Sequence, residues 1–504
     1  MANELFDTLF TNGPCDKIFI ELADGTDLTY GEFEAATGRA AGALSGLGVK
    51  AGDRVAAQVD KSVGALGLYL ASIRCGAVFL PLNTAYTPAE VEYFVGDAEP
   101  TVFVCRPESE EALRPFAEAA GTRLLTMDAG GQAGSWPRVV RSRPWNFEPV
   151  TRGGDDVAAI LYTSGTTGRA KGAMLSHRNL ASNALTLSRY WQFSAEDVLL
   201  HALPIFHTHG LFVAVNTVMV AGASMIFLPR FDAAELVALM SRATVLMGVP
   251  TFYTRLLDEP GLDAEAAGHM RLFVSGSAPL LAETHREFRA RTGHAILERY
   301  GMTETSMNTS NPYEGERRAG TVGLPLPDVE VRVTDPESGV PMEQGGVGML
   351  EVRGPNVFQG YWRMPKKTRA EFREDGFFIT GDMGYIDDRG YVVIVGRGRD
   401  LIISGGYNVY PKEVEMEIDA LPGVKESAVI GVPHPDFGEG VVAVVVTEPD
   451  AGLDEAGVIT RIRARLARYK QPRRVVFLDA LPRNTMGKVQ KNLLRDEYKH
   501  LCNG

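Results

Sequence analysis

The segment YTSGTTGRAKG, residues 162–172, has the composition of a phosphate-binding loop. It follows the apolar run DVAAIL, which predicts a β-strand that ends where the loop begins. Glycines allow backbone N–H groups to converge on one anion, and hydroxyl and ammonium groups add further donors. The spacing differs from that of a Walker A loop. A Ser/Thr/Gly-rich surface turn is the alternative, but the density of donors favours a polyphosphate site. The candidate donors are Thr163, Ser164, Gly165, Thr166, Thr167, Gly168 and Lys171.

A second segment, TVLMGVPTFYTRLL at residues 244–257, places a charge among apolar residues. The pattern predicts a buried strand, a turn and the start of a helix. We therefore expect the guanidinium of Arg255 to be buried, and a buried cation needs an anionic partner. That partner is either a protein carboxylate or a carboxylate of a substrate, which the planar fork of arginine suits.

Four further segments combine glycines with charged or hydroxyl side chains. Taken singly, these segments do not indicate a function. An aspartate such as Asp382 is more often a turn or cap residue, and a lysine such as Lys488 is more often exposed to solvent. The four segments are RYGMTET (299–305), GFFITGD (376–382), GRGRDLIISGGYNVYPKEVE (396–415) and PRNTMGKVQK (482–491).

Together with YTSGTTGRAKG, these segments follow the order found in the adenylate-forming superfamily, which contains acyl-CoA synthetases, peptide-synthetase adenylation domains and luciferases. The chain resembles this superfamily over nearly its whole length. The resemblance implies that a carboxylate attacks the α-phosphate of ATP to give an acyl-AMP and pyrophosphate, and that CoA then attacks the acyl-AMP. Because two anions must approach each other in the first step, cations must offset their repulsion.

The resemblance also implies roles for individual residues. Lys488, Thr163 and Glu304 would be catalytic, and Glu304 with Thr163 would hold Mg²⁺ through hard oxygen ligands. Asp382 would accept hydrogen bonds from the ribose hydroxyls, assisted by Arg397. The complete nucleotide-binding set would be Thr163, Ser164, Gly165, Thr166, Thr167, Gly168, Lys171, Ser277, Ala278, Glu298, Arg299, Tyr300, Gly301, Met302, Thr303, Asp382, Arg397 and Lys488.

A rotation of the C-terminal domain between the two steps is a further implication of the resemblance. Arg399 stands at the expected pivot, where many members carry Asp or Lys. After rotation, CoA would contact Ser404, Gly405, Gly406 and Tyr407. Acetylation of the catalytic lysine controls related synthetases, so Lys488 is expected to be a substrate for an acetyltransferase and a deacetylase.

Four segments resemble one subfamily, the malonyl-CoA synthetases (malonate–CoA ligases), which commonly also accept methylmalonate. They are ALPIFHTHGLF (202–212), MGVPTFYTRLL (247–257), ERYGMTETSMNTSNPY (298–313) and PRNTMGKVQK (482–491). The resemblance implies a short acyl pocket in which Arg255 binds the carboxylate that is not activated. The other lining residues would be Thr208, His209, Ser277 and Met307.

Two alternatives stay open. The chain could be a short-chain or aryl acyl-CoA synthetase in which Arg255 forms a structural ion pair. It could also be a catalytically silent homologue that binds only a nucleotide or a partner, although intact Thr163, Glu304, Asp382 and Lys488 argue against this.

The charge of the chain limits its partners. The formal net charge of 504 residues is −12, which disfavours a general nucleic-acid-binding role. Residues 456–495 nevertheless contain eleven Lys or Arg against one acid, Asp479. This stretch is either a solvated helix face or a patch that attracts the phosphates of CoA.

Several features favour a cytoplasmic enzyme without a membrane partner, either monomeric or homodimeric. The start MANELFDTLF lacks the basic residues of a signal peptide. No apolar stretch is long and uninterrupted enough to cross a bilayer. The four cysteines are scattered without metal or disulfide spacing. We also expect no appended carrier domain.

Short apolar β-rich runs alternate with helical patterns, such as residues 29–48 and 62–76, which predicts an α/β fold with mostly parallel sheets. Beyond about residue 320 the pattern becomes β-rich. We expect an N-terminal ATP- and acyl-binding domain, residues 1–398, with layered sheets and a distorted β-barrel-like subdomain. Residues 399–504 are expected to form a small mobile α+β lid that carries the catalytic lysine.

Overall fold

The computed structural model describes residues 2–163, 170–404, 407–435, 437–449, 451–463, 465–484 and 487–502, without the side chains of residues 399 and 408. Contacts divide the chain into two compact units, Met1–Glu330 with Arg353–Phe378, and Val331–Val352 with Ile379–Gly504. These units are defined by contacts, whereas the predicted boundary at 398/399 separates residues that would move relative to each other about a hinge. That boundary stays a prediction.

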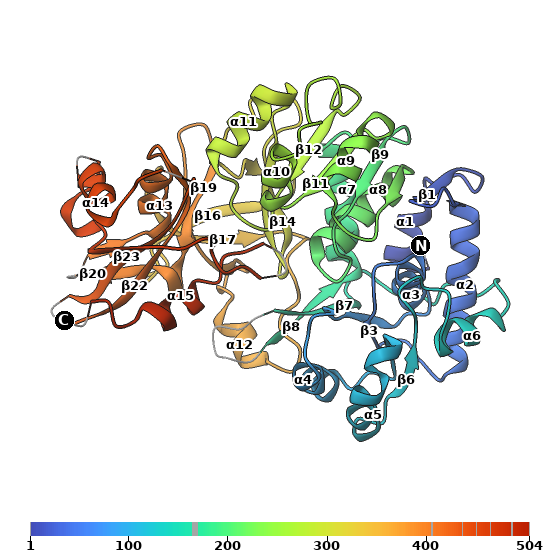
Figure 1. Ribbon diagram of the computed structural model, residues 1–504. Coiled ribbons are helices and arrows are strands. Elements are labelled where there is room, and N and C mark those ends of the chain that lie inside the picture. Colours follow the sequence, from blue (N-terminus) through green and yellow to red (C-terminus); the bar gives the residue numbers. More distant parts are fainter. Residues whose placement is uncertain are drawn as a thin grey trace. The chain divides into compact units, whose positions relative to one another are not determined.

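The first unit contains a six-stranded sheet with the order β6-β5-β3-β4-β7-β8 (Figure 1). All pairs are parallel except β7 with β8, which place Thr163 opposite Lys171 and so bring together the two ends of the predicted phosphate loop. The strands are β3 (Arg54–Gln58), β4 (Val78–Pro81), β5 (Val102–Cys105), β6 (Arg123–Thr126), β7 (Val157–Thr163) and β8 (Lys171–Ser176).

A nine-stranded sheet with the order β15-β14-β13-β12-β11-β9-β10-β1-β2 forms the rest of this unit. Its central run from β13 to β1 is parallel, so the prediction of mostly parallel sheets is confirmed. The strands are β1 (Ile18–Leu22), β2 (Asp27–Thr29), β9 (Val198–His201), β10 (Ser224–Phe227), β11 (Val245–Gly248), β12 (Leu272–Ser275), β13 (Leu297–Met302), β14 (Ser306–Ser310) and β15 (Leu324–Pro325).

The topology of this sheet determines where the candidate residues meet. Ligands bind beyond the carboxyl ends of strands in open parallel sheets. The segments 202–209, 249–255, 276–278 and 303–307 follow β9, β11, β12 and β13 respectively. Four segments that are far apart in the sequence therefore leave the sheet at the same edge.

Helices connect and cover the strands of the first unit. The predicted helices at 29–48 and 62–76 are α2 and α3, whose first turns are capped by the side chains of Thr29 and Ser62. The helices are α1 (Glu4–Phe10), α2 (Tyr30–Gly46), α3 (Val63–Arg74), α4 (Pro88–Ala98), α5 (Glu110–Ala119), α6 (Ser135–Arg141), α7 (His177–Tyr190), α8 (Asn216–Ala221), α9 (Ala233–Leu239), α10 (Pro250–Leu257), α11 (Ala282–Thr292) and α12 (Pro365–Ala370), with the short helices η1 (Pro107–Ser109) and η3 (Met240–Arg242) and the π-helix η2 (His209–Val215).

The β-rich residues beyond 320 form the four-stranded sheet β16-β17-β18-β19. Asp387–Tyr391 joins β18 to β19 as the tight turn of an antiparallel hairpin. The barrel-like closure of this region stays a prediction. The strands are β16 (Glu330–Thr334), β17 (Gly348–Arg353), β18 (Phe378–Ile386) and β19 (Val392–Arg397).

The C-terminal residues form a five-stranded sheet, β21-β20-β23-β22 with β24 on β23, that is covered on both faces. Alternate residues of β22 and β23 pack against α13 and α14 on one face and against α15 on the other (Figure 1), which explains the continuous apolar run VVAVVV. The elements are η4 (Gly398–Asp400), β20 (Ile402–Ser404), β21 (Tyr407–Val409), α13 (Pro411–Asp419), β22 (Val424–His434), β23 (Gly438–Thr447), α14 (Glu455–Arg463), η5 (Arg468–Lys470), β24 (Arg474–Phe477) and α15 (Lys491–Tyr498).

Among the helices built from described residues, none combines the length and apolar character that a bilayer crossing requires.

The opposite, amino-terminal edge of the large sheet is held by one buried carboxylate. Asp197, 3% exposed, accepts from Nε of Arg271 at 2.6 Å, from Nη2 of the same guanidinium at 2.8 Å and from Oγ1 of Thr244 at 2.7 Å. These three residues precede β9, β12 and β11. Burial opposes ionisation of Asp197, but the hydrogen bonds, first among them those from Arg271, prevail and lower its pKa.

We expect Asp197→Asn to lower the free energy of unfolding by about 2–3 kcal/mol, because it leaves a partly buried guanidinium without its counter-charge. Urea denaturation monitors this. The loss should shrink as the pH falls below the ordinary Asp pKa of 3.8, since a group with a lowered folded pKa loses its contribution in acid. Glu110→Gln, in the exposed pair with Arg114, is the control and should change stability by less than about 0.5 kcal/mol. Equal effects of the two variants would contradict the assignment.

Candidate functional site

The residues predicted to hold a metal lie together in the first unit. Thr163 ends β7 and Glu304 follows β13, and Oγ1 of Thr163 lies 3.4 Å from Oε1 of Glu304. Glu304 is 6% exposed. Among the described residues, no group of three or more His, Cys, Asp and Glu side chains could hold a metal ion. An ion at Glu304 would therefore complete its coordination with ligand oxygens, as Mg²⁺ does when it binds through one carboxylate and phosphates.

Two residues that the sequence analysis did not identify complete this cluster. The hydroxyl of Tyr361 lies 3.0 Å from Oε1 of Glu304 and 2.6 Å from Oε2 of Glu371. Burial and the two carboxylates raise the pKa of Tyr361, so the phenol keeps its proton and acts as a donor. No local motif marks either residue, because both come from a segment that the fold brings to β8.

Lys171 also belongs to this cluster. Its Nζ lies 3.2 Å from Oε1 of Glu371 and 4.1 Å from the centroid of the Tyr361 ring. Burial opposes ionisation of Glu371, but Lys367, Tyr361 and Lys171 together lower its pKa. Glu371 thus stays charged and holds the ammonium of Lys171 beside the end of the phosphate loop. The loop residues Ser164, Gly165, Thr166, Thr167 and Gly168 lie outside the described residues.

Arg299 is a buried cation of the first unit. It lies on β13, is 2% exposed, and its Nε and Nη2 find no hydrogen-bond partner among the described residues. Burial lowers the pKa of Arg299 to about 9, and nearby Tyr253 and Glu298 offset only part of this effect. The guanidinium is therefore still a cation at neutral pH, with donors held away from water.

Small residues make room for this guanidinium. A Cβ atom at Gly276, directly after β12, would lie 2.3 Å from Cζ of Arg299. A Cβ atom at Gly301 would lie 2.6 Å from Cε of Met307, which is 2% exposed. The predicted lining residue Met307 and the guanidinium thus occupy the space beside two obligatory glycines.

The remaining predicted lining residues face the same region. Oγ of Ser277, a residue with the left-handed φ of 73°, lies 3.2 Å from Nδ1 of His209. Nε2 of His209 and Oγ1 of Thr208 are buried without partners among the described residues. Burial and the charge of Arg299 hold the pKa of His209 well below its usual value, so its imidazole is neutral. Buried polar atoms without partners, such as Nε2 of His209 and Oγ1 of Thr208, can be satisfied by a polar ligand.

The expectation that Arg255 is buried is wrong. Phe252, Tyr253 and Leu256 form the buried face of α10, whereas Thr254 and Arg255 are exposed. Because successive helical residues are 100° apart, Tyr253 and Arg255 point to nearly opposite sides. Cζ of Arg255 lies 6.0 Å from the centroid of the Phe231 ring. Whether Arg255 contacts a substrate stays a prediction.

The other residues predicted to bind the nucleotide divide between the two units. Glu298, 5% exposed, accepts from the backbone N–H of Leu280 at 3.2 Å. Ala278 follows β12, while Tyr300, Gly301, Met302 and Thr303 continue β13 toward Glu304. In the second unit, Nε of Arg397 lies 2.6 Å from Oδ1 of Asp382, and the two residues face each other across β18 and β19. The structure thus brings Asp382 and Arg397 together, and their binding of a ribose stays a prediction.

The predicted hinge and CoA residues lie at the start of the C-terminal sheet. The backbone of Arg399 lies in η4, next to Asp400, which pairs with Arg495 at 2.8 Å. Ser404 is buried at the end of β20, and Gly405 and Gly406 lie outside the described residues. Tyr407 is 59% exposed and stacks on Tyr469 at 4.7 Å between centroids.

The basic stretch 456–495 is not a bare cationic patch. Among the described residues, at least six of its eleven cations form ion pairs with acids outside the stretch, which favours the interpretation as a solvated, paired surface over a pure phosphate-attracting patch. The pairs are Arg465–Glu417, Lys470–Glu413, Arg474–Glu455, Arg483–Glu426, Lys491–Glu415 and Arg495–Asp400.

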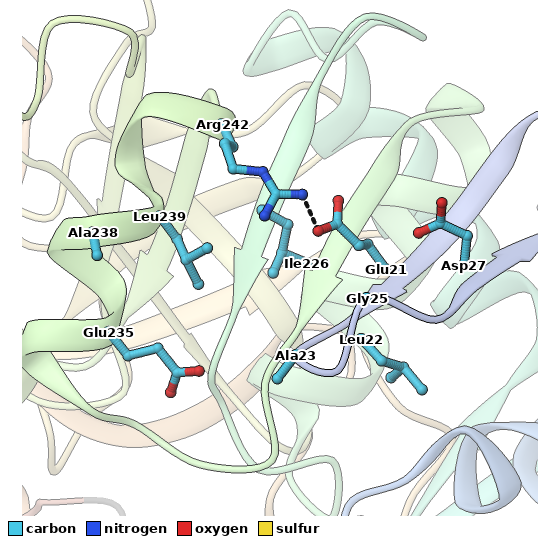
Figure 2. A pocket seen from close by; sticks show the side chains of 10 residues that line it. All are labelled: Glu21, Leu22, Ala23, Gly25, Asp27, Ile226, Glu235, Ala238, Leu239 and Arg242. Atoms are coloured by element: carbon cyan, nitrogen blue, oxygen red, sulfur yellow. Dashed lines mark hydrogen bonds and ion pairs between the residues drawn. The ribbon is translucent and has the colours of Figure 1, made fainter.

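A cavity of about 340 Å³ lies apart from these residues, between the β1–β2 hairpin and α9 (Figure 2). Glu21, Asp27 and Glu235 line it, and Arg242 crosses it to pair with Glu21. None of the predicted site residues contributes to this cavity.

Comparison with known proteins agrees with this arrangement. Residues 8–362 match the AMP-binding enzyme family, and residues 413–488 match the AMP-binding enzyme C-terminal domain. The chain belongs to the AMP-binding enzyme family. Its fold is that of the ATP-bound MatB crystal structure from Rhodopseudomonas palustris, at 60% identity and a TM-score of 0.98 over 100% of both chains.

Curated relatives of this AMP-binding enzyme are CoA ligases. A malonate–CoA ligase of Arabidopsis thaliana is 33% identical over 99% of this chain and 89% of its own length. A sulfoacetate–CoA ligase of Cupriavidus necator is 34% identical over 97% of both chains. The predicted fold class and superfamily are thereby confirmed.

Gly276→Ala should lower the free energy of unfolding by about 1–3 kcal/mol, because the new methyl group overlaps the Arg299 guanidinium in a packed site. Thermal denaturation measures the loss. The matched control is Gly67→Ala in α3, where an added Cβ has no neighbour within 4 Å. A Gly67→Ala protein that is equally destabilised would show that the cost is generic to buried glycines.

Proposed function

We propose that this protein is a malonate–CoA ligase, which converts malonate, ATP and CoA into malonyl-CoA, AMP and pyrophosphate through malonyl-AMP. The observation that carries the proposal is the buried, incompletely hydrogen-bonded guanidinium of Arg299 beside the predicted acyl residues. The similarity to proteins named malonate–CoA ligase supports the same reaction.

Arg299 replaces Arg255 as our candidate for the distal carboxylate of malonate. A buried cation without full pairing is costly in the free protein. A planar carboxylate of a bound dianion would supply the missing acceptors, and the two ends of such an acid would then differ in their surroundings. Only the carboxylate that is not bound to Arg299 would reach the α-phosphate of ATP. A fatty or aryl acid has only the carboxylate that reacts with ATP, so it offers Arg299 no second anionic acceptor. This disfavours the alternative of a general acyl-CoA synthetase.

The same residues limit the size of the acid. Arg299 and Met307 would occupy the space that a longer acyl chain needs. The residues beside them, Gly276 and Gly301, are already glycines, so no smaller side chain could enlarge the pocket there. Thr208 and His209 supply a hydroxyl and a neutral imidazole for the polar ends of the substrate. We propose that one methyl group at C2 is tolerated, so that methylmalonate is a second substrate.

Adenylation requires cations around the reacting anions. Glu304, with Thr163, would hold Mg²⁺, which neutralises phosphate charge. Lys171 would contact the phosphates at the end of the loop, steered by Glu371 and Tyr361. Asp382 and Arg397 would orient the ribose, and Lys488 would stabilise the charge that develops at the α-phosphate.

Thioester formation would use a second arrangement of the lid about Arg399, with Ser404 and Tyr407 near the CoA thiol. Closure would protect malonyl-AMP from water. We propose a cytoplasmic location, and a monomer or homodimer. Acetylation of Lys488 would remove its charge and act as a control.

Sulfoacetate is a second candidate substrate, because it too has one carboxylate and one distal anion, and a sulfoacetate–CoA ligase is among the relatives. Pyrophosphate release should be compared for malonate, methylmalonate, sulfoacetate, succinate and acetate at equal concentrations. The proposal requires malonate to give the highest kcat/KM. Highest activity with acetate or succinate would reject the proposal. Highest activity with sulfoacetate would mean that sulfoacetate, and not malonate, is the substrate.

Arg299→Met should reduce kcat/KM for malonate at least about 10²-fold, near 3 kcal/mol, since the distal carboxylate loses a charged hydrogen-bond partner. The variant should be as stable as the native protein or more stable, because a buried, incompletely paired charge is removed. Arg255→Leu on the exposed face of α10 is the control and should change malonate kinetics less than about threefold. The reverse ranking of the two variants would restore Arg255 as the substrate residue.

Lys488→Ala should slow malonyl-AMP formation at least about 10²-fold, because a cation is lost from the transition state. Presynthesised malonyl-AMP should react with CoA at the native rate. The two half-reactions are followed by pyrophosphate release and by thioester absorbance. An equal loss in both would rule out a lysine that serves adenylation alone.

A further inference from the structure

The described residues on either side of Lys488, 482–484 and 487–491, hydrogen-bond to each other as the two arms of a short hairpin. The N–H of Asn484 donates to the carbonyl of Lys488 at 2.9 Å, and the N–H of Lys488 donates to Oδ1 of Asn484 at 2.9 Å. Arg483 and Val489 form an isolated bridge, and the N–H of Gln490 donates to the carbonyl of Pro482 at 2.8 Å. These bonds fix the shape of the hairpin but not its place on the C-terminal sheet.

One side of the hairpin is attached to β22. Nη2 of Arg483 pairs with Oε2 of Glu426, and Nη1 of the same guanidinium donates to the carbonyl of Gly487 at 2.5 Å. Arg483 thus connects β22 to the residue that precedes Lys488. Both side chains of the ion pair are partly shielded, at 31% and 20% exposed.

The other side is attached to α13. Nζ of Lys491 pairs with Oε1 of Glu415, which also accepts from the backbone N–H of Val429 at 2.9 Å. Burial opposes ionisation of Glu415, but Lys491 and Lys412 prevail and lower its pKa. A charged Glu415, 7% exposed, therefore ties the end of the hairpin to both α13 and β22.

We propose that Glu415 and Glu426 are positioning residues for Lys488: by holding the two ends of its hairpin, they fix where the catalytic ammonium is presented. The inference rests on the proposed function, in which Lys488 serves the adenylation step.

The physical reason is the precision that adenylation demands. A misplacement of about 1 Å can cost roughly 10²-fold in rate. Lys488 has a flexible side chain, so its reach depends on how firmly its backbone is held. Leu494 and Tyr498 of α15 pack in an apolar cluster against β22 and β23 without help from these ion pairs. Loss of the pairs should thus loosen the hairpin and leave the domain folded.

The test uses Glu415→Gln, Glu426→Gln and the double variant of the full-length enzyme. Each single variant should slow malonyl-AMP formation about 5- to 20-fold and the double variant about 50-fold or more, within the range expected for misplaced catalytic groups. CoA transfer from presynthesised malonyl-AMP should change less than about twofold. Because Glu415 is buried against Lys491, Glu415→Gln should also lower the melting temperature, so both half-reactions are assayed well below it, where a loss of folded protein would slow the two equally.

Two controls remove ion pairs of the same unit that do not touch the hairpin, Glu417→Gln (with Arg465) and Glu455→Gln (with Arg474). Both should keep native adenylation rates. The charge swap Glu426→Arg with Arg483→Glu should restore part of the rate lost in Glu426→Gln, which a general loss of stability could not explain.

Native adenylation in the double variant, or equal slowing of both half-reactions, would overturn the positioning role. Failure of the proposed function gives a different result, because Lys488→Ala itself would then show no difference between the half-reactions.

Discussion

A buried guanidinium, two of whose nitrogens have no partner in the part of the chain that the structure describes, is the constraint on which the candidate site depends. Arg299 projects from β13 into the edge where four strand ends meet, and its pKa falls to about 9 without losing the charge at neutral pH. Its neighbours are compatible with that charge: Gly276 leaves room for the guanidinium, and burial, together with the charge of Arg299, lowers the pKa of His209 so that its imidazole stays neutral. Such a site is unfavourable when empty and complementary to a small dianion when filled.

Parallel strand order explains why residues from distant parts of the chain reach this guanidinium. The segments after β9, β11, β12 and β13 leave the sheet at one edge. At the other edge, Asp197 and Arg271 hold the beginnings of β9 and β12 together. The Asp197–Arg271 pair leaves the amino-terminal edge with its charges satisfied internally, whereas ligands of open parallel sheets bind at the carboxyl edge, where donors must stay available.

Much of this could be predicted from the sequence, because motifs with fixed spacing and β-rich apolar runs depend on local rules. The resemblance to the adenylate-forming superfamily placed Thr163 with Glu304 and Asp382 with Arg397, and in the structure each pair is in contact. The expected burial of Arg255 failed for a local reason: the spacing of Phe252, Tyr253 and Leu256 already defines the buried face of α10, and Arg255 lies off that face. Tyr361 and Glu371 could not be found in this way, since only tertiary packing brings them to Glu304 and Lys171.

The two kinds of cation in the protein differ in what they are left to bind. Nε and Nη2 of Arg299 have no hydrogen-bond partner among the described residues, so under the proposed function a bound substrate would satisfy donors that folding has already desolvated. Arg483 and Lys491, in contrast, are committed to Glu426 and Glu415 and gain nothing from a ligand. Under the proposed function, the cation that recognises a substrate thus lacks a full set of hydrogen-bond partners within the described residues. The cations that hold the Lys488 segment are paired with carboxylates. Applied to residues 456–495, this distinction shows why a high count of basic residues does not by itself identify a binding surface: six of those cations are paired with acids of the same unit, and two of the six, Arg483 and Lys491, flank Lys488.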